Sequence, residues 1–333
     1  MSLPAGMRAR HRATKTYYFL DTGEKPRREI PLGSDYHLAV MKWAELTVSK
    51  AATTNSITFR YVAGRYVKDV IPTKARRTQI DNLKELDWLY KFFDDGAAIL
   101  DDIEPKHIRQ YLDWREAKVR ANREKALFSH IWNYARGKGL TNKANPCAGI
   151  KGNAETGRDI YVEDAVYRAV WDAAGDTLRD AIDLAYLTGQ RPADVLKLSH
   201  ADIKDGALVV RQNKTGKLLR VAIEGQLAAV IKRISERKVV GTTLICTSAG
   251  QPMTAYMLRG AFGRARTAAA NSHPKLAAQI KAYQFRDLRA KAGTDKEESE
   301  GMGAAQDQLG HTTATMTSHY VRHRKGKLVT PTK

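Results

Sequence analysis

The residues best suited to phosphate chemistry lie in the second half of the chain. In the segment LGHTTATMTSHY a glycine–histidine step precedes a tyrosine, which places His311 nine residues before Tyr320. A tyrosine oxygen can act as a nucleophile and form a covalent intermediate. A tyrosine next to a basic tail is also an ordinary surface aromatic, and this segment alone does not separate the two interpretations.

Two arginines in FRDLRAKAGTD have a spacing that suits an anion. Arg286 and Arg289 are three residues apart, so on a helix they share one face. Like charges at that distance repel unless an anion lies between them, and the planar guanidinium binds phosphate oxygens through two parallel donors. The alternative is that the pair is neutralised by nearby acids, namely Asp287, Asp295 or Glu297.

Two further segments supply an arginine and a lysine. In YLTGQRPADVLKL a glycine ends one helix and Pro192 can begin the next, so Arg191 lies on a short turn where Asp194 can orient it. In ALVVRQNKTGKLLRVAI two β-type runs flank a turn, which predicts a hairpin with Lys214 at its tip. Taken singly, such an arginine is usually structural and such a lysine usually just exposed.

Composition narrows the class of protein. The chain has 333 residues, which predicts two or three domains, and a net charge of +20 with a pI near 9.9, which favours a polyanionic partner, DNA or RNA. No apolar run approaches the roughly 18 residues that span a bilayer, and the start of the chain lacks a secretory signal. We therefore expect no membrane association.

No cofactor is expected either. Cys147 and Cys246 lack a CxxC spacing, which argues against zinc or a disulfide and suits a reducing cytoplasm. The chain contains no GxxxxGK[ST] loop and no GxGxxG motif after a strand, so nucleotide-driven chemistry is not expected. The sequence predicts a protein that works without metal or cofactor.

The first half of the chain holds candidate DNA contacts. Residues 1–54 show two strand-like runs around a turn at 21–23, and their basic residues suit either a β-ribbon in a DNA groove or a hairpin that caps the next domain. Residues 55–148 have helical periodicity, with helices expected near 105–119 and 122–137. The second of these begins with a basic face that is either solvated or directed toward DNA. The candidate contacts are Arg8, Arg10, Arg12, Asn122, Arg123 and Lys125.

Taken together and in order, the motifs of the second half resemble the tyrosine recombinase family of the phage-integrase type. The resemblance implies a mainly α fold with small β elements (α+β). It places an arm-type DNA-binding unit at 1–54, a helical, SAM-like core-DNA-binding domain at 55–148, a linker at 149–158, and a mixed α/β catalytic domain with a C-terminal tail at 159–333.

The resemblance also implies a mechanism. A site-specific recombinase of this family cleaves and rejoins DNA through a 3′-phosphotyrosyl intermediate, without metal or ATP, and integrates or excises a phage or mobile element. Tyr320 would be the nucleophile and Lys214 would protonate the leaving 5′ oxygen. The remaining residues would bind the phosphate, with Asp194 in support: Arg191, Arg286, Arg289 and His311.

The partners implied are double-stranded DNA attachment sites, three further protomers in a tetramer on DNA, a directionality factor and a host DNA-bending protein. The expected compartment is the bacterial cytoplasm, at the nucleoid.

One departure from the family pattern matters. Arg286 stands where the family usually has histidine, and an arginine stays protonated, so it can donate to phosphate but cannot accept a proton. Asp194 in place of the commoner glutamate is a smaller change. The alternatives are a DNA-binding relative that no longer cleaves, a dimer-resolving recombinase or type IB topoisomerase-like enzyme, and a basic RNA-binding protein.

Overall fold

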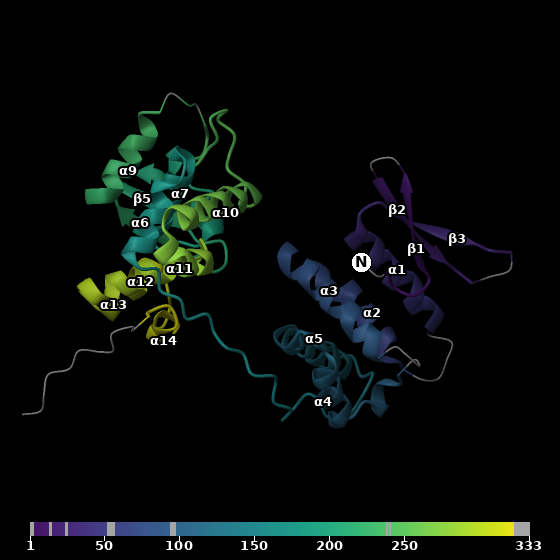
Figure 1. The fold of residues 1–333 in the computed structure, drawn as a ribbon. Helices are drawn as coiled ribbons and strands as arrows, with labels where there is room; N and C mark the ends of the chain where they lie inside the picture. The colour runs from purple at the N-terminus through teal and green to yellow at the C-terminus, as the bar shows by residue number, and fades with distance from the viewer. Residues whose placement is uncertain are drawn as a thin grey trace, which may run out of the picture. The chain divides into compact units, whose positions relative to one another are not determined.

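The chain folds into two compact units, Met1–Thr156 and Gly157–Lys333 (Figure 1). The structure is a computed structural model and describes residues 3–12, 15–23, 26–51, 57–93, 98–237, 239 and 241–322. Within those ranges no helix is long and apolar enough to cross a membrane.

The first unit begins with a three-stranded antiparallel sheet in the order β1-β2-β3. Its strands are β1 (Met7–Arg12), β2 (Lys15–Asp21) and β3 (Glu29–Gly33). The two predicted runs around the turn at 21–23 are confirmed as β2 and β3, whereas β1 was not predicted. Met7, Leu20 and Leu32 are buried, so one face of the sheet contributes to the core while the arginines of β1 lie on exposed positions.

Helices form the rest of this unit. They are α1 (Tyr36–Ala51), α2 (Phe59–Asp69), α3 (Arg76–Phe93), α4 (Pro105–Trp114) and α5 (Lys118–Gly137), with short 3-10 turns at Ile71–Thr73 and Leu100–Asp102. The two helices predicted near 105–119 and 122–137 are confirmed as α4 and α5.

Aromatic side chains fill the core between these helices. The rings of Phe59 and Phe128 stack at 5.0 Å, and Trp43 of α1 meets Tyr90 of α3 edge to face. Sheet and helices thus share one apolar cluster. The predicted boundary between 54 and 55 lies outside the described residues, and the division of this unit into two domains stays a prediction.

The second unit is mainly helical around one small antiparallel sheet in the order β4-β5-β6. The strands are β4 (Ile203–Lys204), β5 (Ala207–Arg211) and β6 (Leu218–Ala222). The helices are α6 (Asp164–Asp172), α7 (Asp176–Thr188), α8 (Pro192–Val195), α9 (Gly225–Ser235), α10 (Ala255–Ser272), α11 (Ala277–Ala282), α12 (Asp287–Glu300), α13 (Met302–Leu309) and α14 (Ala314–Ser318), with 3-10 turns at His200–Asp202 and Pro274–Leu276. With the sheet of the first unit, this confirms the expected mainly α fold with small β elements.

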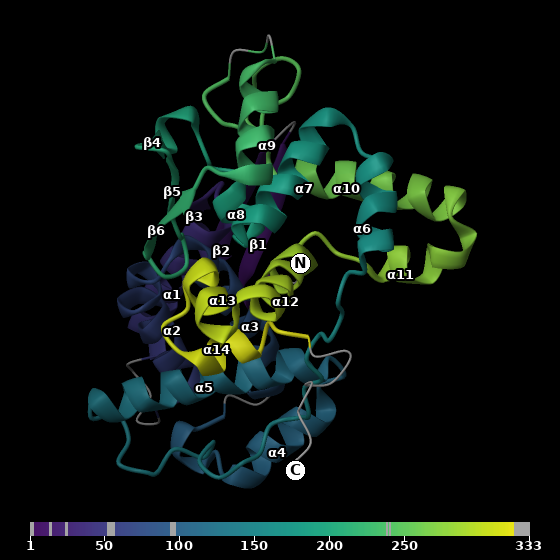
Figure 2. The ribbon, with the colours of Figure 1, turned by 90° about the vertical axis from the view of Figure 1, so that its left-hand side faces the viewer.

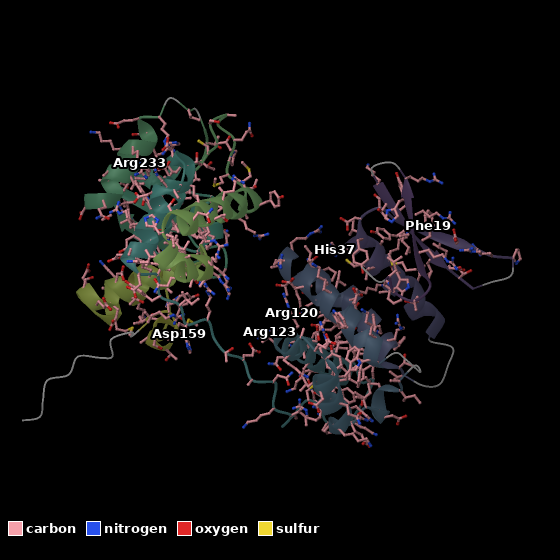
Figure 3. The ribbon with its side chains drawn as sticks, in the orientation of Figure 1. Phe19, His37, Arg120, Arg123, Asp159 and Arg233 are labelled. Atoms are coloured by element: carbon pink, nitrogen blue, oxygen red, sulfur yellow. The ribbon has the colours of Figure 1, made fainter. Side chains whose placement is uncertain are left out.

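Helix α7 runs through the core of this unit. Most of its residues are buried, because it contacts α9, α10 and α12. Arg233 of α9, labelled in Figure 3, donates to Asp180 and Asp183 of α7 at 2.7 Å each. A helix held on several sides fixes the position of its C-terminus, where the TGQR segment begins.

Helices α12, α13 and α14 follow one another with sharp turns between them (Figure 2). The turn after α13 passes through Gly310 at φ 68°, a left-handed conformation that favours glycine. Its consequence is that His311 points back toward the start of α12, where Arg289 lies.

Candidate active site

Arg191 lies at the end of α7 and the start of α8. Gly189 ends α7 at φ 66°, and Arg191 then adopts an extended backbone as the N-cap of α8, with Pro192 as the first helical residue. Its Nη1 lies 3.3 Å from Oε1 of Gln212 and 4.0 Å from Oδ2 of Asp194. The predicted role of Asp194 in orienting this guanidinium is consistent with that distance.

Arg289 is almost fully buried, at 3% exposure. Its Nη1 donates to the carbonyl of Gly189 and its Nη2 to the carbonyl of Leu309, both at 2.7 Å. Burial and the positive charge of Arg191 lower the pKa of Arg289 to about 10, against the opposing effect of Tyr320. Its Nε has no hydrogen-bond partner among the described residues. Arg289 therefore has its position fixed by protein carbonyls and still has donor capacity to spare.

His311 has both ring nitrogens occupied. Nη2 of Arg289 lies 3.0 Å from its Nε2, and its Nδ1 lies 3.1 Å from Oγ1 of Thr317. Because a guanidinium only donates, Nε2 must accept, which assigns the proton to Nδ1. Burial, then Arg289, Arg191 and Lys217, lower the pKa of His311 to about 4, so the ring is neutral at pH 7.

Tyr320 follows α14 and lies against these two side chains. Its ring centroid is 5.1 Å from that of His311, and the guanidinium carbon of Arg289 is 5.2 Å from the Tyr320 ring centroid. The Tyr320 amide donates to the carbonyl of Thr317 at 2.8 Å, and the side chain is partly exposed. The structure thus brings Tyr320, Arg289 and His311 together. Arg191 is close enough for its charge to lower the pKa of Arg289 and of His311.

Lys214 and Arg286 are placed differently from these residues. Lys214 lies on the turn between β5 and β6, and Arg286 is the N-cap residue of α12; both are exposed. In the described part of the chain neither side chain has a hydrogen bond or ion pair with another residue. The hairpin predicted around Lys214 is confirmed, but no contact joins either residue to Tyr320.

Two of the three acids that were the alternative partners of the arginine pair bond elsewhere. Asp287 accepts two hydrogen bonds from Arg158, and Asp295 pairs with Lys291 at 2.9 Å. Within the described ranges no carboxylate forms an ion pair with Arg286 or Arg289. The pair is therefore available to an anion from outside the protein.

Sequence reasoning missed several residues that support the site. Gln190 and Gln212 are both buried and hydrogen-bond to each other at 2.8 Å, and Thr317 holds the ring of His311. The only signal for Gln212 was its place directly before the NKTGK turn.

The candidate DNA contacts of the sheet are partly engaged within the protein. Arg8 pairs with Asp21 at 2.9 Å, and Arg10 pairs with Glu29 at 2.5 Å and lies over the ring of Phe19, which Figure 3 labels. Arg12 is exposed and has no partner among the described residues. These exposed ion pairs are weak, so their arginines can exchange a carboxylate for a phosphate.

The candidate contacts of α5 hold the segment that leaves the first unit. Asn122 donates to the carbonyl of Asn153 at 2.8 Å, Arg123 (Figure 3) pairs with Glu155 at 3.0 Å, and Lys125 donates to the carbonyl of Ile150. Residues 150–163 contain no helix or strand, which suits the linker predicted at 149–158. A DNA role for these three residues stays a prediction.

Among the residues that the structure describes, no group of three or more His, Cys, Asp or Glu side chains is placed to hold a metal ion, and Cys147 and Cys246 are free thiols. The candidate site is instead built from cations, a neutral histidine and a tyrosine.

Comparisons with known proteins agree on one family. Residues 163–327 match the phage integrase family. The integrases of Escherichia phage lambda and Enterobacteria phage 434 are each 25% identical over 332 residues, which cover 91% of this chain and 90% of the relative.

Solved structures show the same fold. A lambda integrase dimer bound to a COC′ core site superposes with a TM-score of 0.70 at 22% identity, over 100% of this chain and 99% of that one. The Tn1549 transposon integrase, in complex with a circular intermediate DNA, gives a TM-score of 0.68 at 15% identity over 80% of this chain and 95% of that one.

Proposed function

The chain belongs to the phage integrase family of site-specific tyrosine recombinases, and we propose that it cuts and rejoins duplex DNA through a covalent bond between Tyr320 and a 3′ phosphate. The observation that supports this most is the contact of the Tyr320 ring with both Arg289 and His311. A tyrosine beside a buried cation with spare donors is placed to meet a phosphate.

Charge gives the physical reason. Arg191 is close enough that its charge lowers the pKa of Arg289, which means that the two guanidinium groups repel each other. A phosphodiester between them would remove that repulsion and receive donors fixed in advance. Such preorganised donors stabilise charge that develops on the phosphate oxygens in the transition state.

In the chemical step the partly exposed Tyr320 hydroxyl gives its proton to solvent, its oxygen forms a bond to phosphorus, and the bond from phosphorus to the 5′ oxygen breaks. Lys214 gives a proton to the departing 5′ oxygen, because its exposed position on a turn leaves it free to reach the leaving group. Arg286 donates to a phosphate oxygen. Attack by a 5′ hydroxyl on the phosphotyrosine reverses the step and joins a new strand.

His311 must change partners if it is to donate to phosphate. Its Nδ1–H donates a hydrogen bond to Thr317, and its Nε2 accepts a hydrogen bond from Arg289. A bound phosphate that draws Nη2 of Arg289 away would free Nε2, and its negative charge would favour protonation of the ring. His311 would then act as a donor only after DNA binds.

The larger assembly follows from the relatives. Lambda integrase has been solved as a tetramer bound to a Holliday junction, and that structure superposes on this chain with a TM-score of 0.69. We propose that four protomers act on two DNA duplexes, with the core sites held by the helical region and arm sites by the basic β1–β3 sheet. A directionality factor and a DNA-bending protein stay predictions.

A covalent-trapping assay tests the function. Nicked duplexes taken from the DNA that flanks the gene are incubated with protein in EDTA, and wild type is compared with Tyr320→Phe on a denaturing gel. We expect an adduct on the DNA 3′ end that is absent from the variant. Specific binding without any adduct would instead identify a DNA-binding relative that no longer cleaves.

A further inference from the structure

Gln212 is a buried polar residue at the end of β5, two residues before Lys214, and only 1% of it is exposed. A buried amide needs partners for its two N–H donors and for the lone pairs of its oxygen, because a group left without one loses its hydrogen bonds to water with nothing in return. The partners of Gln212 come from three segments of the candidate site: the turn that carries Arg191, the turn that carries Lys214, and the segment directly before His311.

The oxygen of Gln212 accepts on one side from the catalytic arginine and on the other from the lysine turn. Nη1 of Arg191 lies 3.3 Å from Oε1, and Oγ1 of Thr215 donates to the same atom at 2.8 Å. The side-chain oxygen therefore joins Arg191 directly to the residue that follows Lys214.

The nitrogen of Gln212 joins two other segments. Nε2 donates to Oε1 of Gln190 at 2.8 Å and to the carbonyl of Leu309 at 2.9 Å. A Cβ at Gly310 would lie 2.7 Å from this Nε2, so only glycine lets the backbone before His311 pack so closely. All hydrogen-bonding positions of the amide are in use.

The backbone of Gln212 also closes the lysine turn. Its N–H donates to the carbonyl of Lys217, and its carbonyl accepts from the amide of Gly216, both at 2.8 Å. Gln212 thus holds the two ends of the turn together while its side chain anchors the turn to the arginine and histidine segments. A further anchor on this side is the amide of Asn213, which donates to Asp194 at 2.7 Å.

We infer that Gln212 is a positioning residue that sets the place of Lys214 relative to Arg191, and so relative to the bond that breaks. The inference rests on the proposed function, since it assumes that Lys214 protonates the leaving 5′ oxygen. The contacts require an amide in place of a carboxylate or an apolar group: glutamate would lose both donations and place a carboxylate beside Arg191, and an apolar residue would leave the carbonyl of Leu309 without this donor.

The test separates proton delivery from every other contribution to cleavage. Single-turnover cleavage is measured on two nicked duplexes that differ in one atom, an ordinary 5′ oxygen or a 5′-bridging sulfur at the scissile phosphate. A thiolate leaves without a proton, so a defect in the placement of Lys214 slows the oxygen substrate and spares the sulfur substrate.

We expect Gln212→Met to cleave the oxygen substrate on the order of 10- to 100-fold more slowly than wild type, because a misplacement of about 1 Å has effects of that size. Most of this loss should disappear on the sulfur substrate, as it should for Lys214→Ala. Gln279→Met, a change at an exposed glutamine of α11, should cleave both substrates at the wild-type rate.

A second variant keeps the test valid if Gln212→Met, a change at a buried residue, fails to fold. Thr215→Val keeps the side-chain shape on an exposed residue and removes only the hydrogen bond to Oε1 of Gln212. It should show a smaller loss with the same recovery on sulfur.

Equal losses on both substrates, or no loss with either variant, would overturn the inference while wild-type cleavage keeps the proposed function intact. Failure of the wild type to form a Tyr320-dependent adduct on either substrate would overturn both.

Discussion

Three cations of the candidate site differ in how the protein holds them. Arg289 represents a buried group, and Lys214 and Arg286 form an exposed group. Arg289 is buried, with its guanidinium held by the carbonyls of Gly189 and Leu309. Lys214 and Arg286 are exposed and make no hydrogen bond or ion pair within the described residues. Arg289 is part of the folded core, whereas Lys214 and Arg286 lie at the surface.

The difference shows how the two groups contribute to catalysis. A buried guanidinium between fixed carbonyls has lost its freedom before DNA arrives, so it offers its remaining donors without further loss of entropy. An exposed lysine or arginine becomes ordered only on the substrate, at a cost of up to about 2 kcal/mol in side-chain entropy. Substitutions should therefore damage both stability and chemistry in the first group, and chemistry alone in the second.

The largest effect is expected for Arg289→Met. Loss of one preorganised donor costs about 100-fold or more, so removal of the whole guanidinium should slow cleavage on the order of 10⁴-fold. The carbonyl of Gly189 loses its donor and that of Leu309 keeps only Gln212, which should lower the free energy of unfolding by about 1–3 kcal/mol. Denaturant melts measure the change in stability, and single-turnover cleavage measures the change in rate. A variant as stable as wild type would contradict the distinction between the buried and the exposed cations.

Lys214→Ala should separate the two effects. Loss of a general acid costs on the order of 100-fold or more in the rate of strand cleavage, yet an exposed side chain without a protein partner should change stability by less than about 0.5 kcal/mol. The same pair of measurements applies. A drop in stability comparable to that of Arg289→Met would show that Lys214 has a structural role.

The sequence predicted the surroundings of the exposed cations better than the contacts of the buried Arg289. The turn around Lys214 follows from local chemistry, because two β-type runs flank NKTG, and α8 follows from the proline after Arg191. The contacts of Arg289 with Gly189, 100 positions away, depend on how α7 and α12 pack, and no local pattern encodes that. The same holds for the amide network of Gln212.

Some local elements were missed for a simpler reason. The strand β1 has the sequence MRARHR, which lacks the β-branched and aromatic residues that mark strands, and it forms because Met7 packs in the core while its arginines face outward. Pairing of Asp287 with Arg158, 129 positions apart, likewise required the fold.

Arg286 tests whether exposure alone makes a residue replaceable. Arg286→His should cleave within a few-fold of wild type, since either side chain can donate to a phosphate oxygen, whereas Arg286→Ala should lose about 10-fold, the worth of one hydrogen bond to a charged group. Neither change should alter the melting temperature. Complete loss of cleavage in Arg286→His would mean that this arginine is fitted to the site as closely as Arg289.

The last comparison concerns His311, which is buried like Arg289 but carries no charge. Its pKa is lowered to about 4 by burial and by the charges of Arg289, Arg191 and Lys217, below the ordinary value of 6.5. The unfolded chain therefore binds a proton between these values that the folded chain does not. The contribution of the neutral His311 ring to the free energy of unfolding is fully present above pH 6.5 and is lost as the pH falls toward 4.

We expect wild type to lose about 1–2 kcal/mol more stability than His311→Gln between pH 6.5 and 4.5, because a glutamine at this position has no proton to gain. Urea melts of both proteins across this range measure the difference, in which the acid sensitivity of the carboxylates cancels. Parallel curves would show that the pKa of His311 is the same in the folded and the unfolded protein. Inorganic phosphate should reduce the difference if it binds beside Arg289, since an anion there raises the pKa of the ring toward its ordinary value.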